Sequence, residues 1–385
     1  MIERGNMGSN SISRPVAIQL ISTGGIYGAE RTLLELATFL QDQGWDSRIV
    51  ALEGNGAGEL MRRAAEHGIA CEAYVPTGRL GLAPMLRRLK AMLSRESHAI
   101  VHSHGCKPDI LLAALGVPRR LPCFATCHSW YSETVKLKAL EFLDKRAVRR
   151  FDHVVAVSEE ICRDLRASGM PINRLSKIDN GISVPTLDAH TREAIRTDWK
   201  VSPGEKLIVQ IGRLAKSKRN SMLLKALIVL SGDVKAKVAL VGDGEERSAL
   251  VEYARSVGLD GRVIFAGYRR DAAAIMEAAD ALVITSNKEG LPIVVLEAMA
   301  VGCPIIATAV GSIPEVLSPE SAWIVPVDDD AALVQALREA LGGKSPARAR
   351  AAEAKSVFLR SYARDVMGRR YLNLYEHAWR ARGWI

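Results

Sequence analysis

The chain has 385 residues, which is more than one hydrophobic core usually serves, so two domains are expected. Hydrophobic residues make up 48% and charged residues 25%, as in globular proteins. The sequence contains no run of about 18 apolar residues, so no transmembrane helix is expected. The net charge of +9 favours anionic partners, whereas an aromatic content of only 5% is unlike the base-stacking surfaces that bind nucleic acids.

The first half of the chain alternates short β-branched runs with helical patterns. Residues 1–14 lack the apolar stretch of a secretory signal, and we expect them to be disordered. Strands followed by helices indicate a parallel sheet covered on both faces, so residues 15–182 are predicted to form an N-terminal α/β domain. Its strands are expected at 16–22, 46–52, 71–76, 99–104, 123–128 and 153–158.

The rhythm breaks at 177–206, where Asn180-Gly181, two prolines and little apolar periodicity indicate a linker, with its centre at 183–202. A second α/β domain is expected at 203–360, and an amphipathic helix at 361–385. Ligands of open parallel sheets bind beyond the carboxyl ends of the strands, so two such domains facing each other predict a cleft. The second set of strands is predicted at 206–212, 236–242, 262–267, 281–286, 304–308 and 322–327.

The stretch SNKEGLPIVVLEAMAVGCPIIATAVGS, residues 286–312, places two carboxylates around a helix start. Glu289 is expected in the loop after a strand, and Glu297 on a helix that begins near Pro292. Amides near Gly290 and Leu291 would lie at the positive end of this helix and suit a diphosphate, whereas the carboxylates suit hydroxyl groups. Hydroxyls on both sides of a diphosphate describe a nucleotide-sugar. The alternative is that Glu289 only caps the helix.

Residues 278–317 resemble the Glu-x7-Glu motif and its surroundings in the retaining glycosyltransferases of family 4. The resemblance extends, more loosely, over nearly the whole chain after residue 14. It implies the GT-B fold, an α/β architecture of two Rossmann-like parallel-sheet domains facing a cleft. Residues 15–182 would then be the acceptor-side domain and 203–360 the nucleotide-sugar-binding domain, and the helix at 361–385 would pack back on the first domain. It also implies a retaining hexosyltransferase, in which Glu297 holds the ribose and Glu289 the transferred sugar.

Two further segments of the second domain resemble the same family. VQIGRLAKSKRNSMLLKAL, from residue 209, matches its Gly-Arg-Leu stretch and following lysine, which implies that Gly212, Arg213 and Lys218 hold the diphosphate. A glycine usually follows that lysine, but this chain has Arg219, and Lys216 is a nearby alternative. A surface ion pair is the other interpretation of Arg213. VIFAGYRRD resembles the base-contacting stretch, with Gly267 and Tyr268 at the strand end, or it is only a strand-to-helix turn.

In the first domain, the resemblance involves a glycine-rich loop and two strand ends. Gly24 and Gly25 would let the backbone approach the donor phosphate or the acceptor, although a tight turn explains them equally well. His104 and His128 are acceptor-side candidates that would donate to the sugar or orient the acceptor, unless they are structural. Together with Glu289, Arg213 and Lys218, His128 completes the predicted catalytic group.

Neither a metal nor another cofactor is expected. The acidic run 328–330 opens a predicted helix and is interpreted as its cap rather than as a metal motif. The six cysteines are scattered in apolar runs, which favours buried reduced thiols. A metal site is the less favoured interpretation of a cluster without ligand spacing, formed by His102, His104, Cys106, Cys123, Cys127 and His128. The donor is expected to be of the UDP or GDP type.

A basic amphipathic segment at 79–95 suggests contact with an anionic membrane. Its apolar face either packs on the sheet, which we favour, or lies on a membrane, and in both cases Arg87, Arg88 and Lys90 are free to meet lipid head groups. The apolar face comprises Leu82, Met85, Leu86, Leu89, Met92 and Leu93.

The predicted protein is therefore a cytoplasmic enzyme, peripheral on the inner face of the membrane, with a lipid-linked acceptor. The pathway would be assembly of a cell-surface polysaccharide or lipopolysaccharide. Two alternatives are a non-catalytic nucleotide-sugar-binding subunit and a sugar-nucleotide epimerase, which shares the fold but lacks the Glu-x7-Glu frame. A nucleic-acid partner is not expected, because no recognisable motif accompanies the charge.

Overall fold

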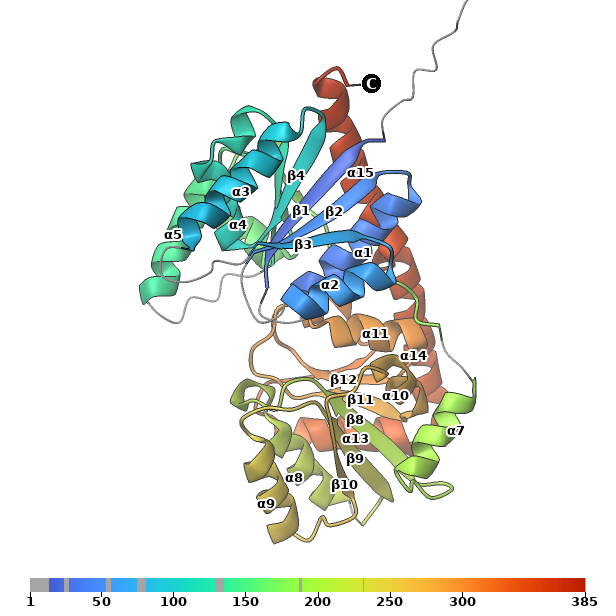
Figure 1. The fold of residues 1–385 in the computed structure, drawn as a ribbon. Coiled ribbons are helices and arrows are strands. Elements are labelled where there is room, and N and C mark those ends of the chain that lie inside the picture. The colour runs from blue at the N-terminus through green and yellow to red at the C-terminus, as the bar shows by residue number, and fades with distance from the viewer. Residues whose placement is uncertain are drawn as a thin grey trace, which may run out of the picture. The chain divides into compact units, whose positions relative to one another are not determined.

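The computed structural model describes residues 14–384, apart from 24–27, 53–56, 75–80, 129–134, 187–188 and 231. The chain forms two compact units (Figure 1). The first contains the residues up to Ala156, residues 161–176 and the chain from Gly368 onward, and the second contains 157–160 and 177–367. The end of the chain therefore belongs to the first unit.

The first unit is built on a seven-stranded sheet in the order β3-β2-β1-β4-β5-β6-β7. The pairings from β3 to β6 are parallel, and their apolar, β-branched sequences suit strands that are buried on both faces. The strands are β1 (Val16–Ser22), β2 (Asp46–Leu52), β3 (Ala70–Tyr74), β4 (Ala99–His104), β5 (Cys123–Cys127), β6 (His153–Ala156) and β7 (Leu175–Lys177).

Helices cover this sheet, and Figure 1 shows α3, α4 and α5 gathered together. The last helix, α15, packs on the first unit at Gly368, where a Cβ atom would lie 2.3 Å from the Phe39 ring, so that only glycine fits. The helices are α1 (Gly28–Asp42), α2 (Ala57–Glu66), α3 (Leu82–Arg95), α4 (Cys106–Ala114), α5 (Val135–Val148), α6 (Glu159–Ala167) and α15 (Arg364–Ala381), with short 3-10 turns η1 (Val117–Arg119) and η2 (Ile172–Arg174).

The second unit is built on a six-stranded parallel sheet in the order β10-β9-β8-β11-β12-β13. Its strands are β8 (Lys206–Ile211), β9 (Ala236–Val241), β10 (Val263–Gly267), β11 (Ala281–Ile284), β12 (Ile305–Thr308) and β13 (Trp323–Val325). Its helices are α7 (Ala189–Asp198), α8 (Asn220–Leu230), α9 (Arg247–Ser256), α10 (Ala272–Ala278), α11 (Ile293–Val301), α12 (Ile313–Val316), α13 (Asp330–Gly342) and α14 (Lys344–Ser361), with the 3-10 turn η3 (Lys216–Lys218).

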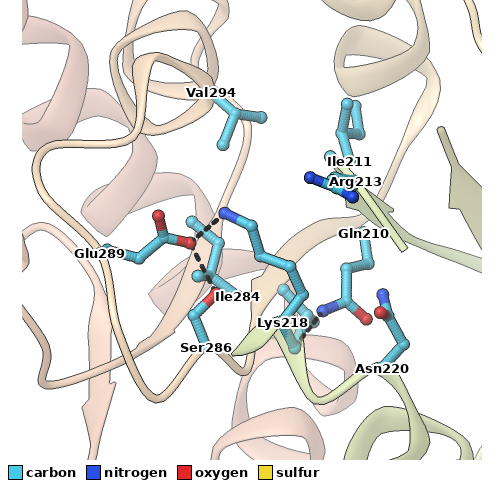
Figure 2. A pocket seen from close by; sticks show the side chains of 11 residues that line it. Gln210, Ile211, Arg213, Lys218, Asn220, Ile284, Ser286, Glu289 and Val294 are labelled. Carbon is cyan, nitrogen blue, oxygen red and sulfur yellow. Dashed lines mark hydrogen bonds and ion pairs between the residues drawn. The ribbon is translucent and has the colours of Figure 1, made fainter. Parts of the chain in front are cut away.

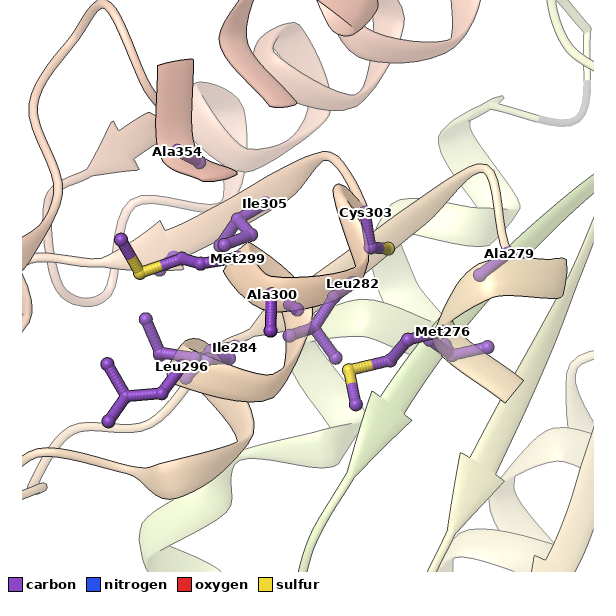
Figure 3. Packing of buried hydrophobic residues seen from close by; sticks show 14 of the residues in the cluster. Met276, Ala279, Leu282, Ile284, Leu296, Met299, Ala300, Cys303, Ile305 and Ala354 are labelled. Carbon is purple, nitrogen blue, oxygen red and sulfur yellow. The ribbon is translucent and has the colours of Figure 1, made fainter. Parts of the chain in front are cut away.

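Helix α11 lies inside the core of the second unit. Figure 3 shows its Leu296, Met299 and Ala300 packed close to Leu282 and Ile284 of β11. The helix ends where Gly302 adopts the left-handed conformation (φ 74°), a geometry that glycine takes at little cost. Because side chains surround it, α11 is held rigidly, and so is any polar group that it carries.

The structure corrects the linker prediction. Residues 183–202 contain α7, which packs against α10 and buries Ile195 in the core of the second unit, where Trp199 is also buried just after the helix. Ile195 is the one buried large apolar residue among the described residues of the helix, so its helical period is weak in the sequence.

Candidate active site

A pocket in the second unit lies beyond the carboxyl ends of β8 and β11, where open parallel sheets bind their ligands. It brings together Gly212, Arg213, Lys218 and Glu289 of the predicted site. The remaining lining residues are Gln210, Ile211, Asn220, Val283, Ile284, Ser286 and Val294.

Glu289 lies in the loop between β11 and α11, as predicted, and it points into this pocket (Figure 2). Its Oε1 atom accepts a hydrogen bond from Ser286 Oγ at 2.6 Å and forms an ion pair with Lys218 Nζ. The N-cap residue of α11 is Pro292, which makes no side-chain cap bond. A hydroxyl and a cation thus orient one oxygen of the Glu289 carboxylate.

The Glu289 loop is fixed from behind by Gly311. A Cβ atom at this position would lie 2.1 Å from the Glu289 carbonyl oxygen, and Gly311 has a φ of 54°, so a side chain is excluded on both counts. The amide of Ser312 also donates to the Gly290 carbonyl at 3.1 Å. These close backbone contacts fix the loop that carries the Glu289 carboxylate.

The Lys218 loop is fixed by two polar side chains that the sequence analysis missed. Thr285 Oγ1 donates to the Lys218 carbonyl at 2.8 Å, and Gln210 Nε2 donates to the same carbonyl at 3.2 Å. Gln210 and Thr285 are buried and lie at the ends of neighbouring strands. Polar residues at the carboxyl end of an otherwise apolar strand are a signal that the sequence did contain.

Arg219 explains how the chain tolerates its departure from the family pattern. The residue adopts a left-handed conformation, with a φ of 50°, which is the geometry that a glycine at this position would supply. Its guanidinium forms an ion pair with Asp328, which precedes α13 and itself has a φ of 64°. The next residue, Asp329, caps α13 through a 2.8 Å bond from the Ala332 amide, in agreement with the predicted cap.

The remaining predicted donor residues are dispersed within the second unit. Arg213 lines the pocket but is exposed, and it forms a surface ion pair with Glu245 at 3.1 Å. Glu297 lies on α11, as predicted, and is buried, although it does not line the pocket. Gly290 and Leu291 precede α11, and Gly267 and Tyr268 lie at the end of β10, where Tyr268 is exposed.

In the first unit, the structure brings His104 and His128 together at the carboxyl ends of β4 and β5. His104 Nδ1 lies 3.2 Å from His128 Nε2, and the rings are stacked. Burial lowers the pKa of His128 to about 4 and holds the pKa of His104 well below its usual value, so both rings are neutral at pH 7. Neutral rings bind through directed hydrogen bonds rather than through charge.

The predicted glycine-rich loop cannot be placed, because Gly24 and Gly25 lie outside the described residues. Within the described ranges, no group of three or more His, Cys, Asp or Glu side chains is arranged to hold a metal ion. All six cysteines are free thiols.

Two family models match the chain, one in each half. "Glycosyltransferase Family 4" matches residues 26–184, and "Glycosyl transferases group 1" matches residues 191–357. Together the two ranges cover most of the chain, and the second includes the whole pocket described above.

Individual relatives agree with these matches. The chain is 27% identical to N-acetyl-alpha-D-glucosaminyl L-malate synthase of Bacillus anthracis, over 60% of this chain and 61% of that protein. It is 25% identical to the lipopolysaccharide core biosynthesis glycosyltransferase LpsE of Rhizobium meliloti, over 90% of this chain and 95% of that protein.

Anabaena HepE, solved in complex with UDP-glucose, has the same fold. It superposes with a TM-score of 0.83 at 19% identity, over 94% of this chain and all of that chain (100%). The chain therefore belongs to the family 4 glycosyltransferases, enzymes that use nucleotide-sugars, and its two parallel-sheet units have the GT-B fold.

Proposed function

We propose that this protein is a retaining hexosyltransferase that moves a sugar from a UDP- or GDP-linked donor to an acceptor. The observation that carries the proposal is the Lys218–Glu289–Ser286 arrangement in the pocket beyond β8 and β11. A cation next to an oriented carboxylate suits a donor in which phosphate oxygens lie next to sugar hydroxyls. HepE, with the same fold, binds UDP-glucose.

Each predicted residue has a role in this proposal. Lys218 and Arg213 bind the diphosphate, because negative charge grows on it as the glycosidic bond breaks. Glu289 binds hydroxyls of the transferred sugar. The remaining donor contacts are Gly24, Gly25, Gly212, Gly290 and Leu291 for the phosphates, Glu297 for the ribose, and Gly267 and Tyr268 for the base.

The ion pair in the pocket prepares both partners for the donor. Lys218 and Glu289 are partly buried, with 27% and 11% of their side chains exposed, so each would be costly to leave without a partner. When a diphosphate pairs with the Lys218 ammonium group, sugar hydroxyls donate to the Glu289 carboxylate and replace the ion pair that it has lost. The departing phosphate is then the group that takes the proton from the acceptor hydroxyl. His128 and His104 lie on the acceptor side.

The experiment is a panel of UDP- and GDP-sugars, tested for thermal stabilisation and then for release of the free nucleotide. The expected result is a rise in melting temperature with one nucleotide class, because a ligand of the folded state stabilises it by mass action. Turnover is expected to continue in excess EDTA. Stabilisation without any turnover would point to a non-catalytic subunit, and turnover that needs added magnesium would contradict a metal-independent reaction.

We further propose a lipid-linked acceptor at the inner face of the cytoplasmic membrane, in assembly of a cell-surface polysaccharide or lipopolysaccharide. LpsE is a relative whose name states a lipopolysaccharide role. No helix in the described part of the chain is long and apolar enough to cross a membrane. We propose that surface residues of the first unit provide the attachment.

The apolar face of α3 packs on the first unit, as the sequence favoured, and we propose that α5 supplies the apolar contact with the membrane. Helix α3 buries Met85, Leu89 and Leu93 in the first unit, so most of its apolar face is used for packing, while Arg87, Arg88 and Lys90 are exposed. Helix α5 instead exposes Val135, Phe142 and Leu143, at 86%, 63% and 52%.

Basic residues accompany these apolar side chains. Lys138 and Arg146 are exposed on α5, and Arg149 and Arg150 follow its end. No acidic side chain of α5 is exposed, because Asp144 is buried and Glu141 is partly buried beside Lys145. An exposed stripe that mixes large apolar and basic residues fits an anionic lipid surface.

A further inference from the structure

A buried polar network runs through the core of the first unit and ends at His128. It connects β1, β4 and β5 with the last helix, α15. Its members are Gln19, His102, His104, Thr126, His128, Tyr371 and Tyr375, and all except His128 are almost fully buried. Polar groups in such a position are retained where they fix a geometry that an apolar core would not fix.

The hydrogen bonds of this network form a chain with one direction. Gln19 Nε2 donates to the Tyr375 hydroxyl at 3.3 Å, which leaves Gln19 Oε1 to accept from His104 Nε2 at 2.9 Å. An amide oxygen only accepts, so the proton of the His104 ring is on Nε2. His104 Nδ1 is then an acceptor, and it faces His128 Nε2 at 3.2 Å.

The direction of these hydrogen bonds determines which nitrogen of His128 carries the proton. Because His104 Nδ1 accepts, His128 Nε2 must donate, and the neutral His128 ring leaves its Nδ1 atom without a proton. Burial lowers the pKa of His128 to about 4, which keeps the ring neutral at pH 7. None of the described residues hydrogen-bonds to His128 Nδ1, and the ring is partly exposed.

Tyr375 is the second hydrogen-bond partner of the Gln19 amide. Its hydroxyl also contacts His102 Nδ1, and His102 Nε2 lies 2.8 Å from Thr126 Oγ1. When the tyrosine O–H donates to His102 Nδ1, its oxygen is left to accept from the Gln19 amide N–H. His102 then donates to Thr126, which lies 2.9 Å from the Tyr371 hydroxyl. Every bond of the network is satisfied with this polarity.

We propose that Gln19 and Tyr375 are positioning residues that hold His128 in the tautomer with its proton on Nε2, so that Nδ1 accepts a hydrogen bond from a substrate hydroxyl. The inference rests on the proposed function for the role of that hydroxyl. The tautomer itself is a property of the protein alone. It is a consequence of contacts between the strands of the first unit and the last helix of the chain.

The test is nitrogen NMR of the full chain labelled with 15N-histidine, with the His128 signals assigned from His128→Gln. The expected spectrum has protonated Nε2 and unprotonated Nδ1. Gln19→Met keeps the size of the side chain but cannot accept from His104, and it should give a mixture of tautomers. Gln19→Glu still accepts and should retain the original tautomer.

Two tyrosine variants form a matched pair. Tyr375→Phe removes the hydroxyl that orients Gln19 and should also mix the tautomers. Tyr371→Phe removes a neighbouring buried hydroxyl that does not touch Gln19 and should leave His128 unchanged. A proton on His128 Nδ1 in the unmodified protein, or an unchanged tautomer in Gln19→Met, would overturn the proposal whether or not the enzyme transfers sugars.

Ligand and rate measurements then locate the hydroxyl. A shift of His128 Nδ1 with UDP-glucose but not with UDP assigns the hydroxyl to the donor sugar, and a shift that appears only when an acceptor is added assigns it to the acceptor. No shift in any of these samples would contradict a contact between Nδ1 and a substrate hydroxyl. Gln19→Met and Tyr375→Phe should lower kcat by about 10–100-fold with little change in KM for the donor, which is the range for outer partners that fix a histidine tautomer. An equal rate in both variants would show that the tautomer has no part in turnover.

Discussion

Glu297 shows how a single buried carboxylate can be tested as a ribose ligand. The residue is 6% exposed on α11, whose apolar side chains lie in the core of the second unit. Glu297→Ala should weaken UDP or GDP binding by about 1–3 kcal/mol, because a charged hydrogen bond is left unmade. Calorimetry measures the change. Unchanged affinity in a folded variant would remove Glu297 from the binding site.

The two cations of the pocket, unlike Glu297, should affect the rate of turnover more than the binding of the nucleotide. Lys218→Ala and Arg213→Ala are expected to lower kcat more than they weaken ground-state binding, because the charge that they neutralise grows in the transition state. Lys218 should have the larger effect, since Arg213 is exposed and paired with Glu245. Steady-state kinetics with Lys216→Ala as the control distinguish the two lysines. Near-normal kcat in Lys218→Ala, with loss in Lys216→Ala, would reverse the assignment.

Arg219 combines a strained backbone with an ion pair, and the two contributions can be separated. Arg219→Ala loses the pair to Asp328 but keeps a Cβ atom at φ 50°, so it should lower the free energy of unfolding by up to about 1 kcal/mol. Arg219→Gly loses the same pair but relieves the strain, and should be at least about 0.5 kcal/mol more stable than the alanine variant. Urea denaturation gives both values. Equal stability of the two variants would mean that the left-handed backbone costs nothing here.

At the scale of elements, the sequence predicted most strands and α11, because apolar, β-branched runs are typical of burial on both faces. The strand β7 was not predicted, since its three residues are too few to show a period. Helix α7 was missed because Ile195 is the one large apolar residue that the described part of this helix buries. The histidine network was not predictable either, since Gln19 and Tyr375 are 356 positions apart and no local pattern connects them.

Helix α5 is the element on which the membrane proposal depends. Phe142→Ala with Leu143→Ala should reduce co-sedimentation with anionic phospholipid vesicles by at least about tenfold, because burying one large apolar side chain contributes about 1.5–3 kcal/mol. Lys138→Gln with Arg146→Gln should reduce binding mainly at low salt, since the attraction is screened.

The matched control for α5 removes exposed apolar groups elsewhere. Ile172 and Leu359 are 73% and 50% exposed, and Ile172→Ala with Leu359→Ala should leave vesicle binding unchanged. Nucleotide binding should be normal in all of these variants. If the unmodified protein ignores anionic vesicles at low salt, or if the α5 variants only change self-association in ultracentrifugation, the surface serves another partner.

At the scale of the whole molecule, the buried histidines make stability depend on pH. Burial lowers the pKa of His102 to about 3 and that of His128 to about 4, from an ordinary value of 6.5. Between pH 6.5 and about 4 the unfolded chain therefore binds more protons than the folded one, and stability falls as the pH falls. Each histidine contributes about 1.4 kcal/mol per pH unit in this window.

A variant comparison isolates this effect from the carboxylates. Burial next to Asp144 raises the pKa of Asp109 well above its usual value, which opposes the histidines by favouring the folded state as the pH falls. His128→Gln leaves Asp109 in place and removes one buried histidine, so its loss of stability between pH 6.5 and 4.5 should be smaller than that of the unmodified protein by about 2–3 kcal/mol. Urea denaturation at several pH values measures the difference. Parallel pH profiles would mean that His128 becomes protonated without unfolding, and that the neutral ring on which the proposed tautomer depends is not maintained in acid.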